Sequence, residues 1–146
     1  MSHRLSVVLE IAEREEQTES AKLARLNQRL EAQRQRREQL QSYGDEYQAR
    51  IAANARHGIN AHMYREHRQF IEHINNSIKA QSHESDALRR LIDQQHQRWA
   101  EARTRVKSLQ RAIEKSAQAK ADKRERYAEM AADEWAQGKR SNPVDD

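Results

Sequence analysis

Residues Tyr43–Ile78, YGDEYQARIAANARHGINAHMYREHRQFIEHINNSI, contain the one break in a sequence whose pattern is otherwise helical from end to end. The break is His57-Gly58-Ile59-Asn60. Gly58 suits the left-handed backbone that ends a helix, and Asn60 can cap the helix that follows. The stretch therefore predicts a turn at residues 58–60 between two helices.

The outer limits of the two helices follow from capping signals. Ser2 can cap the first helix, and Gly138 with Asn142-Pro143 can close the second. We expect helices at about 3–57 and about 61–137, followed by a disordered tail at 138–146. The predicted fold is all-α: residues 1–146 form a single elongated domain, a long antiparallel two-helix coiled coil (a helical hairpin) whose second helix is longer than the first.

The composition favours this fold over a globular one. Charged residues make up 34% of the 146 residues and aromatic residues 5%, with three glycines and one proline. Chains with this composition and so few helix breakers are typically long helices or coiled coils. One phenylalanine and two tryptophans are too few to fill a compact core. The apolar area must therefore lie along a seam between the helices.

Apolar residues recur at spacings of three and four along both helices, the pattern of a coiled coil. Polar residues interrupt it, so the coil is imperfect. The first seam contains Leu5, Leu9, Ala12, Leu23, Leu26, Leu30, Leu40, Tyr47 and Ile51, and also Glu16, Glu19, Gln33, Arg37 and Gly44. The second contains Ile71, Ile74, Ile78, Leu88, Ile92, Trp99, Ala102, Val106, Leu109, Ile113, Tyr127 and Met130.

The short turn and the polar interruptions predict the register between the helices. The tightest pairing places Gln33 opposite Ser85 and Arg37 opposite Gln81. A shift of one heptad would put these polar groups against Leu88 and Ile92, where their desolvation is costly. The same register pairs Tyr47 with Ile71, Gly44 with Ile74, Leu30 with Leu88, Leu9 with Leu109 and Leu5 with Ile113. It leaves roughly 20 residues of the second helix, Glu114–Gln137, without a partner in the chain.

Several classes of function are disfavoured. The sequence has no cysteine, no glycine-rich phosphate loop and no pattern from which a two-helix protein could build a concave site. We expect no enzyme activity, cofactor or small-molecule ligand. His57, His62, His67 and His73 are not spaced by three or four, so we expect no metal site. No signal peptide or membrane span is expected, which predicts a soluble, cytoplasmic protein.

Charge is distributed unevenly around a formal net charge of +4. The acidic run Glu10–Glu19 is predicted to lie near Arg103, Arg105 and Lys107 in the inferred register, which favours mutual charge complementarity. The unpartnered end of the second helix is basic and also carries apolar residues, which favours a protein partner over an ordinary solvated helix. A nucleic-acid partner is not expected, because no aromatic residues alternate with the basic ones. The residues concerned are Lys115, Lys120, Lys123, Arg124, Arg126, Tyr127, Met130 and Trp135.

Two readings are open for Phe70, which lies just off the seam beside Ile71 and Ile74. It can cover the core next to the turn, or it can form an exposed docking patch with Ile74. Periodicity alone slightly favours the core position. Gly44 fills no space opposite Ile74 and predicts thin packing there, which shifts the balance a little toward the patch.

The central stretch combines Tyr43 and Tyr47 flanking an acidic pair, then Gly58-Ile59, then Gln69-Phe70-Ile71 with Ile74 and Ile78. With these elements it resembles the FliJ family of bacterial flagellar export proteins. Leu5–Glu13, the total length and the two-helix pattern are similar too. The resemblance implies an antiparallel two-helix coiled coil that takes part in flagellar type III protein export and is similar to the central stalk of rotary ATPases.

The resemblance also implies partners and sites. The partners would be the export ATPase FliI, its regulator FliH, the membrane gate subunit FlhA and export chaperones, at the cytoplasmic face of the inner membrane. The gate-binding residues would fall on Phe70, Ile74, Ser77 and Gln81. The terminal end would insert into the ATPase ring, which assigns that contact to Lys115, Lys120, Lys123, Arg124, Tyr127 and Met130. The alternatives are an injectisome stalk protein, a basic nucleic-acid-binding coiled coil and a self-associating structural coiled coil.

Overall fold

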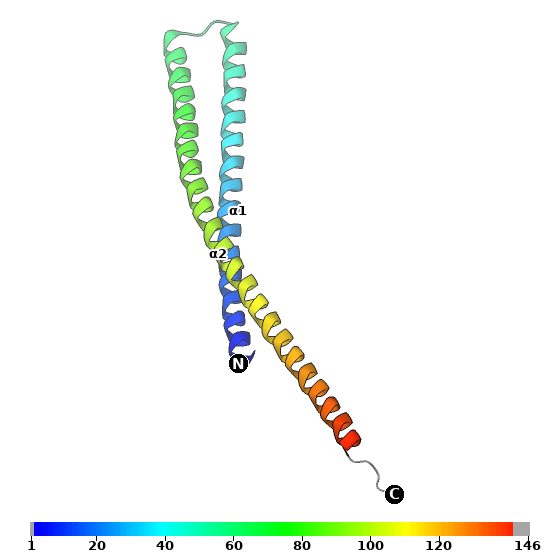
Figure 1. The fold of residues 1–146 in the computed structure, drawn as a ribbon. Coiled ribbons are helices and arrows are strands. Elements are labelled where there is room, and N and C mark those ends of the chain that lie inside the picture. The colour runs from blue at the N-terminus through cyan, green and yellow to red at the C-terminus, as the bar shows by residue number, and fades with distance from the viewer. Residues whose placement is uncertain (1, 142–146) are drawn as a thin grey trace. The chain divides into compact units, whose positions relative to one another are not determined.

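Two long helices make up the fold of residues 2–141, the part of the chain that the computed structural model describes, with side chains for residues 3–139 (Figure 1). Helix α1 spans Ser2–Ala55 and helix α2 spans Ala61–Ser141. The described residues form no β-strand. The prediction of an all-α helical hairpin with a longer second helix is confirmed.

The turn between the helices has the predicted chemistry. Gly58 has a φ of 84°, in the left-handed region that glycine adopts at low cost. The Asn60 side-chain oxygen accepts a hydrogen bond of 2.8 Å from the backbone N–H of Met63, as a helix-capping residue does. Helix α1 ends at Ala55, two residues earlier than expected. The reason is that the N–H groups of His57 and Gly58 each bond to a carbonyl three residues back, which tightens the last turn.

The far end of α2 differs from the prediction. The helix continues through Gly138 to Ser141, so the expected end at residue 137 and the disordered tail from residue 138 were wrong for residues 138–141. A glycine inside a helix costs only about 1 kcal/mol relative to alanine, which does not force a helix to end. The remaining expected tail, 142–146, lies outside the described residues.

Packing divides the chain into two units, which we name by what each contains. The turn unit is Gln17–Ala100, and the terminal unit comprises the described residues up to Glu16 and from Glu101 onward. Both helices run through both units, and we propose on that ground that the chain is one domain, as the sequence predicts.

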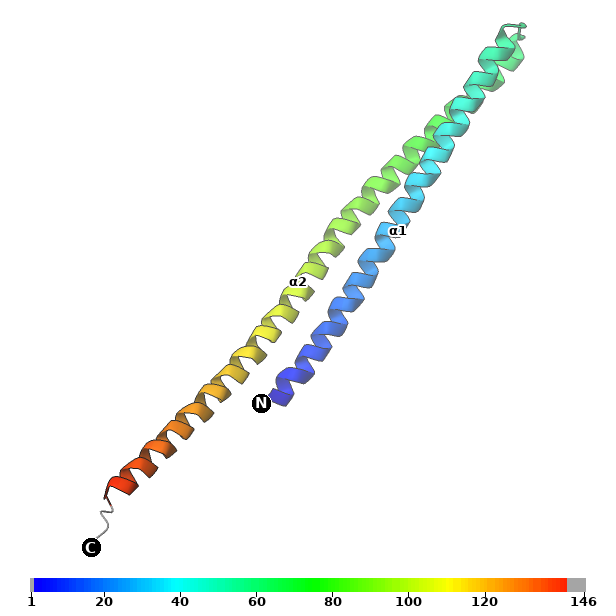
Figure 2. The same ribbon diagram turned by 90° about the vertical axis from the view of Figure 1, so that its right-hand side faces the viewer.

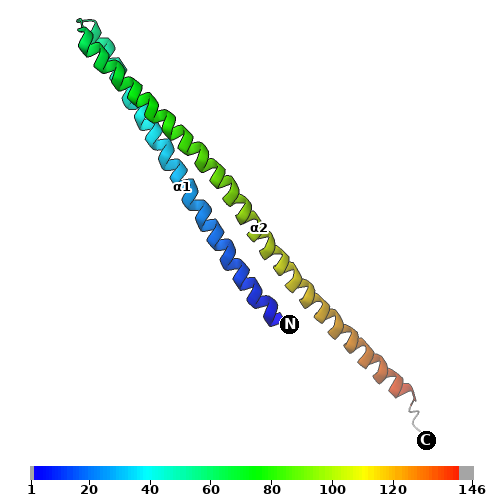
Figure 3. The ribbon, with the colours of Figure 1, turned by 90° about the vertical axis from the view of Figure 1, so that its left-hand side faces the viewer.

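In the turn unit α1 and α2 pack antiparallel in the predicted register (Figures 2 and 3). Ser85 Oγ donates a 3.0 Å hydrogen bond to Gln33 Oε1, the pairing expected from the sequence. Gly44 lies against Ile74, so closely that a Cβ on the glycine would be 3.3 Å from Ile74 Cγ2. Ile74 and Leu88 are the buried apolar residues of this unit, and burial of such a side chain stabilises by about 1.5–3 kcal/mol.

The terminal unit has a narrower core with charged flanks. Ala12 and Val106 are buried. Glu16 pairs with Arg103 at 3.2 Å and Glu15 with Arg105 at 3.3 Å, which confirms the expected contact between the acidic run and the basic residues of α2. Lys107, expected beside the same run, has no ion-pair partner among the described residues. Such exposed pairs contribute at most about 1 kcal/mol each, so they specify register more than they stabilise.

Charged and polar residues recur along the whole length of both described helices, α1 and α2. Neither contains a stretch that is long and apolar enough to cross a membrane.

Candidate partner-binding surfaces

An aromatic cluster lies beside the turn, built from both helices of the turn unit. The Phe70 ring lies 4.4 Å from the Tyr47 ring and 5.9 Å from the Tyr43 ring, between centroids. The hydroxyl of Tyr47 is hydrogen-bonded to His67 Nδ1 at 2.5 Å. Aromatic pairs at such separations contribute about 0.5–1.5 kcal/mol beyond their burial. The cluster therefore stabilises the contact between the two helices and also places aromatic rings at the surface.

The members of this region differ in accessibility. Tyr43 is 49% exposed, Phe70 is part-buried and Ile74 is 5% exposed. The absence of a side chain on Gly44 allows Ile74 to pack closely against the α1 backbone. A small groove remains beside this contact, lined by Gln41, Gly44, Asp45, Gln48, Ile71, Ile74, Asn75 and Ile78. In the structure Ile74 belongs to the core, and the accessible part of the surface is Tyr43 with the edge of Phe70.

Ser77 and Gln81, the other two residues that the resemblance assigns to the gate, are part-buried on α2. The side-chain oxygen Gln81 Oε1 is buried and has no hydrogen-bond partner among the described residues. The expected polar layer with Arg37 is not formed: Arg37 is exposed, and no hydrogen bond joins the two side chains. A guanidinium at the edge of a two-helix coil keeps more hydration by pointing outward.

Sequence reasoning missed a second polar layer at Gln95. Its amide donates to the backbone carbonyl of Glu19 at 3.1 Å and, through a short hydrogen bond, to the Glu19 carboxylate. Gln95 is buried. Its heptad position, three residues after Ile92 and four before Trp99, was the signal that could have found it.

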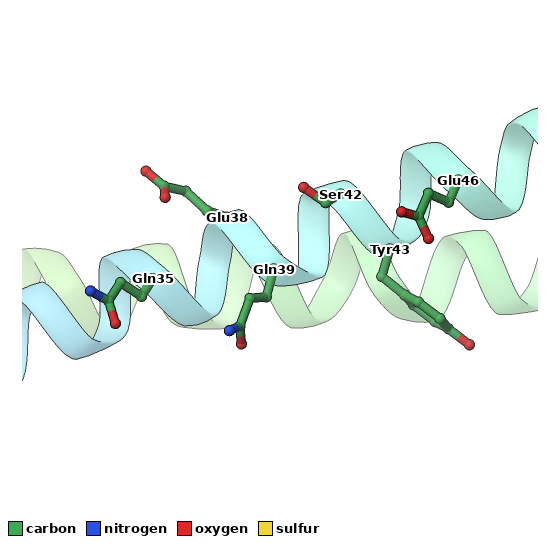
Figure 4. A pocket seen from close by; sticks show the side chains of 6 residues that line it. All are labelled: Gln35, Glu38, Gln39, Ser42, Tyr43 and Glu46. Atoms are coloured by element: carbon green, nitrogen blue, oxygen red, sulfur yellow. The ribbon is translucent and has the colours of Figure 1, made fainter.

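An open groove of the turn unit lies on α1 alone (Figure 4). Its residues follow one another at spacings of three and four along one helix, so a molecule in the groove would be contacted from one side only. Such a surface lacks the enclosure and the opposed acid and base of an active site. The lining residues are Gln35, Glu38, Gln39, Ser42, Tyr43 and Glu46.

An exposed ion pair lies just before this groove on the same helix. The guanidinium of Arg34 donates to both carboxylate oxygens of Glu31, at 2.7 and 3.0 Å. These hydrogen bonds lower the pKa of Glu31 below its ordinary value, and the Arg34 charge lowers it further. Both side chains are exposed, so the pair supports α1 locally without forming a chemical site.

The second candidate surface is the end of α2 in the terminal unit, which we call the overhang, residues 114–139. Figure 2 shows α2 continuing past the start of α1. Tyr127 is 62% exposed, Met130 59% and Trp135 66%, which agrees with the absence of a partner helix expected from the register. The ammonium group of Lys123 lies 6.0 Å from the Tyr127 ring, and that of Lys139 lies 4.1 Å from the Trp135 ring. The other basic residues assigned to this surface, Lys115, Lys120 and Arg124, are exposed as well.

Val7, Val8 and Ile11 form an exposed apolar face on α1 of the terminal unit, which the sequence analysis did not single out because these residues lie off the seam. Within residues 3–139, no three histidine, aspartate or glutamate side chains lie close enough to hold a metal ion.

The family model for "Flagellar FliJ protein" matches residues 1–142, nearly the whole chain and both units. The chain belongs to the FliJ family. No curated protein and no solved structure matches it. As a FliJ-family protein, the chain has a role related to flagellar protein export, and the family is not an enzyme family. The resemblance to this family is thereby confirmed over residues 1–142.

Proposed function

We propose that this FliJ-family protein is a non-enzymatic coupling protein, or stalk, of the flagellar type III export apparatus. It links the export ATPase ring to the membrane export gate and so assists flagellum assembly. The observation that carries the proposal is the presence of two separate surfaces with exposed aromatic side chains, one in each unit: Tyr43 beside Phe70, and Tyr127 with Trp135. Exposed apolar groups that cluster on a soluble protein are typical of binding sites.

The turn unit supplies the contact with the gate subunit FlhA. Phe70, Ile74, Ser77 and Gln81 are the residues that the family assigns to this contact, and Tyr43 extends the surface because its ring lies edge-on to Phe70. Tyrosine and phenylalanine supply large contact areas at low entropic cost, which is why few such residues dominate many interfaces. Ile74 contributes indirectly, because its close packing against Gly44 fixes the position of the α1 backbone next to the aromatic cluster.

Replacing Tyr43 by alanine tests this contact. Tyr43→Ala is expected to weaken binding to the cytoplasmic domain of the gate by about tenfold or more, because a large exposed ring that packs on Phe70 is lost from the interface. Tyr64→Ala is the matched control: Tyr64 is 55% exposed in the same unit but has no ring contact in the cluster. Binding is measured by titration calorimetry and helicity by circular dichroism. Equal affinities for the two variants would contradict the assignment.

Phe70→Ala and Ile74→Ala separate docking from support. Phe70→Ala is expected to weaken gate binding more than Ile74→Ala does, at matched helicity, because Phe70 is the more accessible of the two. Both residues would belong to the core alone if both variants lost helicity and if the molecules that remained folded bound the gate as tightly as the wild type.

The terminal unit supplies the contact with the export ATPase FliI and its regulator FliH, through Lys115, Lys120, Lys123, Arg124, Tyr127 and Met130. These side chains are exposed, and a basic surface with apolar centres suits a groove with an acidic rim. Export chaperones are further partners. We place the protein in the cytoplasm, associated peripherally with the inner membrane at the flagellar base.

Removing the residues after Gln118 tests the terminal contact. The truncated protein is expected to keep its unfolding temperature within a few degrees, because no residue from 119 to 139 is buried. Its affinity for the ATPase should fall at least about tenfold, measured by pull-down and by ATPase stimulation. An unfolded truncation would mean that the overhang is part of the folding core, and an unchanged ATPase affinity would remove the overhang from the contact.

A further inference from the structure

The overhang continues the seam of α2 beyond the point where α1 can cover it. The heptad positions after Ile113 are occupied by Ser116, Lys120, Lys123, Tyr127, Met130, Glu134 and Gln137, at alternating spacings of three and four. All of them from Lys120 onward are exposed. A seam with this spacing is the pattern that pairs with another helix.

The charges on this seam discriminate between the ways a second helix could lie on it. A parallel copy would place Lys120, Lys123 and Glu134 each against its own counterpart, and like charges at a seam are destabilising. An antiparallel copy centred between Tyr127 and Met130 places Tyr127 against Met130 and Lys123 against Glu134. By the twofold symmetry of such a pair, each contact occurs twice.

The flanking positions agree with the antiparallel arrangement. Positions on the same side of the seam face each other in an antiparallel coil, which sets Arg126 against Asp133 and Arg124 against Ala131. A shift by one heptad in one direction would instead set Lys123 against Tyr127, and in the other direction Glu134 against Met130, so both shifts bring a charge onto an apolar group. None of Lys123, Arg126, Asp133 and Glu134 has an ion-pair partner among the described residues.

The lengths also fit. Helix α1 begins at Ser2, which covers the seam to about Ser116 in the register of the terminal unit. A second α2 in the antiparallel arrangement, ending at Ser141, would reach back to about the same Ser116. The second copy therefore occupies the stretch that α1 leaves open, without competing with it.

We propose that two copies of this chain associate through their overhangs as an antiparallel pair centred on Tyr127 and Met130. The pairing stands on the residues of α2 alone. Such a pair would cover the residues proposed to contact the ATPase, so the paired protein could not bind the ATPase ring. This consequence rests on the proposed function. The contact is short and mostly charged, so it forms weakly and is weakened further by salt.

A charge exchange on the full-length protein tests the pairing. Sedimentation equilibrium of the wild type should show the average mass rising from the monomer value of 17.2 kDa with concentration. Lys123→Glu should lower the association constant at least about tenfold, because each copy then opposes Glu134 with a like charge. Lys123→Glu/Glu134→Lys should restore it, since the exchanged pair is again attractive. Arg98→Glu, an exposed arginine in the turn unit, is the control and should change nothing.

Orientation is tested by thiol trapping, since the sequence has no cysteine of its own. A mixture of Tyr127→Cys and Met130→Cys chains should give mainly the mixed disulfide dimer on mild oxidation, and more of it than a mixture of Tyr127→Cys with Glu129→Cys. A wild type that stays monomeric at all accessible concentrations overturns the proposal. A charge exchange that fails to restore the average mass also overturns it.

The same variants keep this inference separate from the proposed function. ATPase affinity is measured on each variant at a concentration where all are monomeric. If Lys123→Glu weakens self-association but leaves the ATPase affinity unchanged, only the proposed ATPase contact is refuted. If the wild type binds the ATPase but never self-associates, only the pairing is refuted.

Discussion

Leu88→Ala is expected to lower the free energy of unfolding of the hairpin by about 2–4 kcal/mol, the usual cost of truncating a buried leucine. Leu88 is 3% exposed and lies on the α2 seam, in the register that sets it opposite Leu30. In a two-helix coil no second layer of side chains can move in to fill the gap. The loss is measured by urea unfolding followed by circular dichroism.

Leu91→Ala is the matched control for this prediction. Leu91 is the same residue type three positions further along the same helix, but it is 49% exposed. Its replacement should change stability by no more than about 0.5 kcal/mol, since alanine is the better helix former and little buried area is lost. If the two variants were equally destabilised, the seam would not run through Leu88.

Two glutamines of the turn unit are expected to respond to the same substitution with opposite signs. Gln81→Leu should raise the free energy of unfolding by about 1–2 kcal/mol, because a buried amide oxygen without a partner is removed. Gln33→Leu should lower it by about 1 kcal/mol, because the buried hydroxyl of Ser85 then loses its acceptor.

Thermal and urea unfolding of the two variants decide this prediction. Functional residues often lower the stability of the protein that carries them. If Gln81 contacts the gate, the affinity of Gln81→Leu for the gate should fall while its stability rises. A destabilising Gln81→Leu would show that the amide oxygen has a partner in solution, such as a bound water.

The sequence predicted the architecture because its decisive signals are local. Gly58 and Asn60 specify a helix end and a helix start by their own backbone and capping preferences, and the structure has both. The register was predictable too, since only one alignment keeps Gln33 with Ser85 and away from the leucines. The end of α2 was less predictable, because a single glycine lowers helix stability without deciding where the helix stops.

The candidate sites were predictable in position but not in exposure. Heptad spacing placed Phe70 and Ile74 beside the turn, yet it could not say which of them faces the other helix and which faces solvent. That depends on how closely Gly44 lets the backbones approach and on where the Tyr43 and Tyr47 rings lie. Hydration and hydrogen bonding within the coil compete for each polar side chain. Arg37 is exposed and keeps its hydration, whereas the Gln95 amide is buried because it finds an acceptor on Glu19.

The sequence by itself determined the two helices, the turn, the pairing and the unpartnered basic end, since periodicity and capping act over a few residues at a time. The tertiary structure alone decided that Ile74 is covered, that Tyr43 is open, and that the side-chain oxygen of Gln81 is buried with no hydrogen-bond partner among the described residues. Those outcomes depend on distances between side chains from separate helices. A pattern along one chain specifies which residues meet, whereas only their packing specifies how much of each remains available to a partner.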